Sequence, residues 1–179
     1  MTDIIKNSIP NIPDWPSNGV VYRDITGLVS TPEAFKLSVD SIASYMLQSN
    51  IDCILAPDAR GFIWGAPVAY KLDKPLHLIR KPGKLPPPTY EYFFDYEYAS
   101  TSLNIKSTAD INSNTRVGVI DDVNATGGTA LAVAKLLEKF GTPASNIYYA
   151  SVVNLPFLGG STKIQQEGIN FYSVIEYNE

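Results

Sequence analysis

Residues Val119–Thr129 read VIDDVNATGGT, which joins the end of an apolar run to two carboxylates and a glycine-rich turn. Two glycines let a backbone turn tightly and point its N–H groups inward, toward a bound anion. A helix predicted directly after the turn adds the partial positive charge of its N-terminus. The carboxylates of Asp121 and Asp122 would repel a phosphate, but they can accept hydrogen bonds from a diol or from metal-bound water. The stretch therefore predicts a site for a phosphorylated sugar, with the alternative that the two aspartates only close an acidic strand end.

Around this stretch, short apolar segments alternate with segments of helical character. Strands are predicted at 51–56, 76–79, 116–120, 147–153 and 171–177, and helices at 32–49, 61–72 and 130–141. Such alternation is typical of an α/β fold with a mostly parallel central sheet flanked by helices. Ligands of parallel sheets bind beyond the carboxyl ends of the strands. Because PDARG (57–61) and the opening stretch both follow predicted strands, we expect them to form one site.

Two local predictions concern the N-terminal part of the chain. Thr31 is expected to cap the first long helix, with Pro32 at the first helical position, where proline is tolerated. Residues 9–24 contain three prolines and a glycine, a composition that disfavours regular structure. This segment is therefore predicted to be an irregular lid.

Length, composition and charge limit the class of protein. A chain of 179 residues with 45% hydrophobic content suits a single domain, residues 1–179. The net charge of −4 without a block of like charges makes nucleic acid an unexpected partner. The first ten residues lack the apolar segment of a secretory signal, and no apolar run is long enough to span a membrane. A single cysteine, Cys53, fits a reducing compartment, so we expect a cytoplasmic protein with no membrane partner.

Isolated reactive residues are given structural roles. Cys53 lies in a predicted buried strand and is expected to be inert, and His77, the only histidine, lies within an apolar strand. No cluster of histidine and cysteine residues suggests a protein-bound transition metal.

The motif DDVNATGGT resembles the phosphoribosyl pyrophosphate motif of the type I phosphoribosyltransferases. Further segments resemble the adenine phosphoribosyltransferase family in the same order, and together they cover nearly the whole chain: GVVYRDIT (19–26), DARGFIWGAP (58–67), IRKPGKLP (79–86), YEYASTSLNI (96–105) and SVIEY (173–177). The resemblance implies the type I phosphoribosyltransferase fold, with a small N-terminal hood at about 9–24 and a flexible catalytic hairpin loop at about 83–105. It also implies a homodimer that converts adenine and phosphoribosyl pyrophosphate to AMP and pyrophosphate with Mg²⁺.

The resemblance also implies a role for each matching residue. The 5′-phosphate would be held by the turn Ala125, Thr126, Gly127, Gly128 and Thr129, and the ribose by Asp121 and Asp122. Pyrophosphate would be bound by Asp58, Ala59, Arg60, Arg80, Lys81 and Lys84. The catalytic residues would be Glu97 and Tyr98 together with Arg60, and the purine base would contact Val20, Tyr22, Arg23, Val123 and Asn124. Mg²⁺ would be held mainly by substrate oxygens and water, with no protein metal site.

Several of these roles have plainer alternatives. The basic cluster RKPGK (80–84) also fits a solvated surface, although fixed cations there would stabilise a departing diphosphate. The segment YEYFFDYEY (90–98) also fits a β-hairpin whose aromatic side chains only pack, and Tyr22 also fits a packed residue of the N-terminal arm. A general acid or base such as Glu97 contributes roughly 10²–10⁴-fold to a rate.

One departure from the family pattern leaves the base open. Val123 and Asn124 stand where the family usually has two leucines, and the amide of Asn124 can both donate and accept hydrogen bonds. If Asn124 points into the pocket, it could pair with adenine or with a 6-oxopurine such as hypoxanthine or guanine, and if it points into solvent it means little. The alternatives to adenine salvage are therefore the same reaction on another purine, or a non-catalytic regulator that binds phosphoribosyl pyrophosphate.

Overall fold

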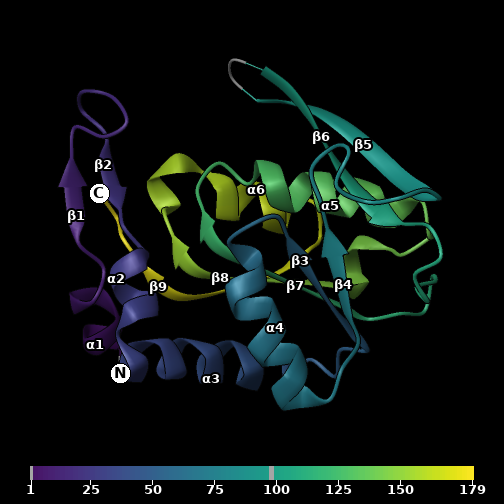
Figure 1. The fold of residues 1–179 in the computed structure, drawn as a ribbon, viewed down its shortest axis with the longest axis horizontal. Helices are drawn as coiled ribbons and strands as arrows, with labels where there is room; N and C mark the ends of the chain where they lie inside the picture. Colours follow the sequence, from purple (N-terminus) through teal and green to yellow (C-terminus); the bar gives the residue numbers. More distant parts are fainter. Residues whose placement is uncertain (1, 97–98) are drawn as a thin grey trace.

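A five-stranded parallel sheet forms the centre of the molecule (Figure 1). The structure, a computed structural model, describes residues 2–96 and 99–179. The strand order is β4-β3-β7-β8-β9, and every neighbouring pair is parallel. The strands are β3 (Cys53–Pro57), β4 (Leu76–Ile79), β7 (Val117–Asn124), β8 (Ile147–Asn154) and β9 (Asn170–Glu176). The predicted α/β class and parallel sheet are confirmed.

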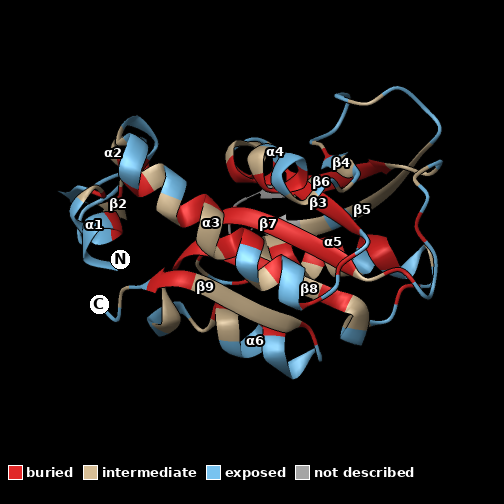
Figure 2. Cartoon of the chain, turned by 90° about the horizontal axis from the view of Figure 1, so that it is seen from below, coloured by how far each residue is buried: buried red, intermediate tan, exposed pale blue. Residues whose placement is uncertain are grey.

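Two hydrophobic clusters cover the two faces of this sheet, and the strands between them are largely buried (Figure 2). One cluster contains residues of α1 (Thr2–Asn7), α2 (Thr26–Ser30), α3 (Pro32–Gln48) and α4 (Gly61–Leu72). The other contains residues of α5 (Gly128–Glu138), α6 (Gly160–Gln166) and an antiparallel hairpin, β5 (Thr89–Tyr96) and β6 (Ala99–Lys106). The short 3₁₀ helices η1 (Ala144–Asn146) and η2 (Pro156–Leu158) flank β8. Apolar side chains on both faces explain why the central strands read as continuous apolar runs.

The predicted irregular lid contains regular structure. Strands β1 (Asn11–Pro13) and β2 (Val21–Arg23) pair antiparallel, with Asn11 opposite Arg23. The expectation of no regular structure is wrong because a two-stranded ribbon has only edge strands, which tolerate proline. We call residues 9–24 the hood.

Two boundary predictions need correction. The predicted strand 116–120 continues through both aspartates to Asn124, because Asp121, Val123 and Asn124 pair in register with β8. The side chain of Thr31 does not cap α3; its hydroxyl donates instead to the carbonyl oxygen of Gly27, at 2.9 Å. The remaining predicted strands and the helices at 32–49 and 61–72 are confirmed to within a few residues.

Within the described ranges 2–96 and 99–179, no helix combines the length and apolar character needed to cross a membrane.

Candidate active site

A cavity of about 600 Å³ lies beyond the carboxyl ends of β3 and β7. It brings together the loop after β3, the end of β7, the start of α5 and the inner side of the β5–β6 hairpin. Its lining residues are Pro57, Asp58, Ala59, Arg60, Lys81, Phe94, Thr101, Leu103, Asp121, Asp122, Val123 and Thr129. The prediction that PDARG and the opening stretch form one site is therefore confirmed in position.

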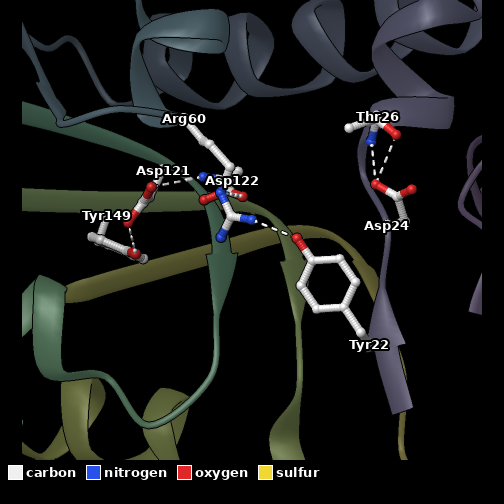
Figure 3. Close-up of polar contacts among 7 residues, drawn as sticks. All are labelled: Tyr22, Asp24, Thr26, Arg60, Asp121, Asp122 and Tyr149. Atoms are coloured by element: carbon white, nitrogen blue, oxygen red, sulfur yellow. Dashed lines mark hydrogen bonds and ion pairs between the residues drawn. The ribbon is translucent and has the colours of Figure 1, made fainter. Parts of the chain in front are cut away.

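The paired aspartates form the floor of this cavity. Asp121 Oδ1 accepts a hydrogen bond from the backbone N–H of Asp122 at 2.9 Å, and the Tyr149 hydroxyl lies 3.4 Å from Asp121 Oδ2 (Figure 3). Burial raises the pKa of Asp121 well above its usual range, and the neighbouring charge of Asp122 raises it further. Two adjacent carboxyl groups in a low-dielectric position do not readily ionise at the same time, because their negative charges repel each other. A ligand that donates hydrogen bonds, such as a sugar diol, would satisfy these oxygens.

Arg60 connects the acidic floor to the hood. Its Nε lies 2.7 Å from Asp122 Oδ2, and its Nη1 donates to the Tyr22 hydroxyl at 2.9 Å (Figure 3). The Asp122 side chain is 5% exposed, whereas that of Arg60 is 48% exposed. The arginine therefore keeps one side open to the cavity, and it places Tyr22 at the cavity edge.

The glycine-rich turn has the conformation that an anion site requires. Gly127 has a φ of +83° and precedes α5, which begins at Gly128. Left-handed φ values cost glycine little, so the backbone can reverse here and enter the helix. A hollow of about 50 Å³ is lined by residues 123–129 and Tyr149. The turn thus leads directly into a helix N-terminus, where the first backbone N–H groups have no partner within the helix.

Gly160, which the sequence reading did not single out, packs against this turn. Its N–H donates to the carbonyl oxygen of Ala125 at 3.1 Å. A Cβ at Gly160 would lie 2.2 Å from the same oxygen and 2.5 Å from the backbone nitrogen of Gly127. Gly160 begins α6, more than thirty residues along the chain, so only its place in a Gly-Gly pair hinted at a close backbone approach.

The predicted basic residues divide between the cavity and its surroundings. Lys81 lines the cavity together with Asp58 and Ala59, which are joined by a cis peptide bond. Arg80 Nε pairs with Asp58 Oδ2 at 2.9 Å, and this hydrogen bond holds the pKa of Asp58 below its usual value. Arg80 and the exposed Lys84 are not among the lining residues. Arg80 is thus paired with the loop, and Arg60 and Lys81 lie at the cavity. The predicted pyrophosphate contacts of all these basic residues stay predictions.

The predicted base contacts are only partly gathered at the cavity. Val123 lines it, Tyr22 reaches it through Arg60, and Val20 is 41% exposed on the hood. The Arg23 side chain points elsewhere: it donates to Asn11 Oδ1 and to the Glu179 carbonyl oxygen, and its guanidinium lies over the ring of Tyr177. A role for the backbone of Arg23 stays a prediction.

Asn124 is buried and points neither into solvent nor freely into the cavity. Its Nδ2 donates to Asn154 Oδ1 at 2.9 Å, and Asn154 Nδ2 donates to Glu176 Oε1 at 2.9 Å. These three side chains form a polar ladder across β7, β8 and β9. The amide of Asn124 is therefore held in one orientation by its neighbour.

The predicted catalytic pair Glu97 and Tyr98 lies outside the described residues, so its role stays a prediction. The β5–β6 hairpin that precedes and follows it contributes Phe94, Thr101 and Leu103 to the cavity wall. The alternative that this segment is a packed hairpin is correct in form, and the same hairpin also borders the cavity. Its mobility remains a prediction.

Cys53 and His77 lie away from the cavity lining. Cys53 is buried in β3, and burial raises the pKa of its thiol to about 12. His77 is half-buried in β4, and burial lowers its pKa. Both groups fit the structural roles predicted from the sequence.

The donor set at the cavity fits a magnesium ion carried by a substrate. Among residues 2–96 and 99–179, no group of three or more His, Cys, Asp or Glu residues could by itself hold a metal. Mg²⁺ usually keeps several waters and binds through one or two carboxylates together with substrate phosphates. Asp121 and Asp122 supply two carboxylates of this kind.

Comparisons with known proteins agree with this geometry. A family model of the phosphoribosyl transferase domain matches residues 29–153. Adenine phosphoribosyltransferase of Actinobacillus pleuropneumoniae serotype 5b (strain L20) is 41% identical over 175 residues, which cover 98% of this chain and 96% of that protein. Among crystal structures, adenine phosphoribosyltransferase from Thermoanaerobacter pseudethanolicus has a TM-score of 0.88 at 37% identity, with 99% of this chain and 100% of that chain covered. APRTase from Giardia lamblia complexed with 9-deazaadenine has a TM-score of 0.91 at 30% identity, with 99% and 98% covered. The chain belongs to the phosphoribosyltransferase family and, within it, to the adenine phosphoribosyltransferases.

Proposed function

We propose that this protein transfers the phosphoribosyl group of phosphoribosyl pyrophosphate to adenine, with AMP and pyrophosphate as products. The observation that carries the proposal is the cavity where an acidic pair and a half-exposed arginine lie next to the hollow of the glycine-rich turn. The relatives described above carry the name of this activity, and the solved complex with 9-deazaadenine shows that one of them binds an adenine analogue.

The cavity suits each part of phosphoribosyl pyrophosphate. The 5′-phosphate would sit in the turn Ala125–Thr129, where backbone N–H groups and the N-terminus of α5 face an anion. Asp121 and Asp122 would accept hydrogen bonds from the ribose hydroxyls. The diphosphate would lie near Arg60 and Lys81, whose positive charges would stabilise the charge that develops as the bond to the sugar breaks.

Magnesium belongs to the proposal as a cofactor that arrives with the substrate. When bound, it would neutralise part of the charge on the leaving diphosphate. Asp121 and Asp122 would help to hold it, directly or through water. The base would stack on Tyr22, and Glu97 would handle a proton of the base while the hairpin excludes water from the cationic sugar centre.

The ladder that holds Asn124 weakens the one argument for a 6-oxopurine substrate. A site discriminates strongly between purines when buried hydrogen-bonding groups are fixed in one pattern. Because Asn124 Nδ2 donates to Asn154, the amide cannot turn to suit two opposite base patterns without breaking that bond. The support that Asn124 gave to a 6-oxopurine substrate is therefore weakened.

The proposal is tested by measuring AMP formation from adenine and phosphoribosyl pyrophosphate with Mg²⁺, and again after addition of a chelator. We expect turnover that depends on all three components. Turnover that continues with excess chelator would contradict the role of magnesium, and binding of phosphoribosyl pyrophosphate without AMP formation would indicate a regulator. The predicted homodimer is checked on the same preparation by sedimentation equilibrium.

A further inference from the structure

Tyr177, which follows the last residue of β9, lies between two cationic side chains of the N-terminal segment. The Arg23 guanidinium carbon is 4.2 Å from the centre of its ring, and Lys6 Nζ is 5.5 Å from it. Arg23 also donates to the Glu179 carbonyl oxygen and to Asn11 Oδ1 on the paired strand β1. The contacts join both hood strands and α1 to the end of the chain, which lies beside β2 (Figure 1).

The end of β9 that carries Tyr177 is itself fixed to the sheet. The backbone N–H of Tyr177 donates to the Asn154 carbonyl oxygen at 3.1 Å. Glu176 Oε1 accepts from Asn154 Nδ2 at 2.9 Å and from the Ser173 hydroxyl at 3.1 Å. Through Asn154 the same ladder reaches Asn124, next to the acidic floor. Tyr177 therefore extends from a rigid part of the sheet toward the hood.

Arg23 is adjacent to Tyr22 on a strand of only three residues. Tyr22 packs edge-on against Trp15, with ring centres 4.3 Å apart, and its hydroxyl accepts from Arg60 (Figure 3). Successive side chains of a strand point to opposite sides. The contacts that hold the Arg23 side chain on one side of β2 therefore also fix the position of Tyr22 on the other side.

We propose that Tyr177 is a positioning residue for base binding: its ring holds Arg23 and thereby presents Tyr22 to the base. The proposal rests on the function proposed above, in which Tyr22 stacks on adenine. The effect should fall mainly on the base, because the turn 125–129 and Asp121 have contacts outside the hood: Gly160 on Ala125, and Tyr149 on Asp121.

The test compares Tyr177→Leu with Tyr177→Phe. The Tyr177 hydroxyl is buried and has no hydrogen-bond partner among the described residues, so Tyr177→Phe keeps the ring contact and is the matched control. We expect Tyr177→Leu to raise the KM for adenine roughly 2- to 30-fold, the range that loss of a cation–π contact implies. The KM for phosphoribosyl pyrophosphate should change much less, because within the described part of the chain only Arg60 links Tyr22 to the acidic floor. Tyr177→Phe should behave like the parent protein.

A role in stability alone would lower the melting temperature and the active fraction while leaving both KM values unchanged, and that result overturns the proposal. If Tyr177→Leu does not fold, Arg23→Met removes the same contact from the other side and should also raise the KM for adenine. Where both fold, the double variant should raise the KM for adenine no further than either single change, because both remove one contact. Additive effects overturn the proposal.

Tyr22→Ala separates this inference from the function on which it rests. If Tyr22→Ala raises the KM for adenine but Tyr177→Leu does not, the positioning role fails and the stacking role stands. If Tyr22→Ala leaves the KM for adenine unchanged, stacking on Tyr22 fails, and the positioning role fails with it.

Discussion

Asp121 is a buried carboxyl group whose ionisation opposes folding. Its pKa is raised in the folded protein by burial and by Asp122. Between the unfolded and the folded pKa, the folded protein therefore keeps a proton that the unfolded chain has lost. As pH rises from the unfolded value near 3.8 through the folded pKa, this difference lowers the stability. The cost is fully present at any pH above the folded pKa. A ligand diol would be one way to offset it.

We therefore predict that Asp121→Asn raises the melting temperature, and that the gain grows as pH rises from about 4. The amide can still accept from the Asp122 N–H and face the Tyr149 hydroxyl, so the fold should persist. The same change should weaken binding of phosphoribosyl pyrophosphate and lower turnover. Thermal melts over a pH series, with titration of the substrate, measure both effects.

Asp110→Asn is the control for that series, because Asp110 is an exposed carboxylate outside the cavity. It should alter neither the pH dependence nor substrate binding. Unchanged affinity in Asp121→Asn would remove the aspartate from the ribose site.

Gly160 supports a second prediction at the residue scale. The added Cβ of Gly160→Ala would overlap the backbone of Ala125 and Gly127, and over-packing of this kind typically costs about 1–3 kcal/mol. The overlap falls on the turn 125–129, which is proposed to hold the 5′-phosphate. We therefore expect the KM for phosphoribosyl pyrophosphate to rise about tenfold or more. The KM for adenine should change much less.

Ser161→Ala, at the next position of α6, is the matched control and should leave both KM values unchanged. An equal rise of both KM values in Gly160→Ala would instead indicate a general disturbance of the fold.

Asn124 supports a third prediction. Asn124→Ala removes a buried partner of Asn154, and leaving such a group without its hydrogen bond costs about 1–3 kcal/mol of stability. Since the amide is already engaged with Asn154, we expect the preference for adenine to persist. Denaturant unfolding measures the loss of stability, and activity on a panel of bases measures the base preference. A preference that moved to hypoxanthine or guanine would show that Asn124 reads the base.

At the scale of elements, the β5–β6 hairpin both packs in the core and borders the cavity. Its Tyr90 packs edge-on against Phe140, which follows the end of α5, while Phe94 lines the cavity. The hairpin thus belongs to the core on one side and to the site on the other.

For Glu97→Gln we predict a fall in kcat of roughly 10²–10⁴-fold, the usual worth of a general acid or base. The affinity for phosphoribosyl pyrophosphate should change little, because the groups proposed to hold it lie on other elements. Steady-state kinetics with both substrates measures this. Glu91→Gln is the control, because Glu91 lies on the same hairpin and accepts a bond from Ser102 that glutamine can also accept. Near-normal turnover in Glu97→Gln would remove Glu97 from the mechanism.

The sequence predicted those helices, strands and turns that depend on neighbouring residues alone. Apolar runs identified all five central strands, and glycine placement identified the turn before α5. The end of β7 was placed too early because two aspartates look like a strand end, whereas pairing with β8 keeps them in the sheet. The ribbon of the hood was missed for a related reason: Pro10, Pro13 and Pro16 suppress the strand signal, yet a short edge pair forms around them.

At the scale of the whole molecule, contacts between distant segments were the part that no local pattern could predict. Gly160 meets Ala125 and Gly127, and Arg23 meets Tyr177, only because the sheet brings loops from different strands to one edge. The same arrangement unites Arg60, Asp122 and Tyr22. The composition of the site was predictable from motifs, whereas its supports depend on the order of the strands.

The proposed function depends above all on which base the protein accepts, and a comparison of bases measures this. Pyrophosphate release from phosphoribosyl pyrophosphate with Mg²⁺ is followed with adenine, hypoxanthine, guanine and xanthine offered separately. We expect kcat/KM for adenine to exceed that for each 6-oxopurine by about 10⁴-fold or more, as where fixed hydrogen-bonding groups meet the opposite pattern. A 6-oxopurine that matched or exceeded adenine would contradict it.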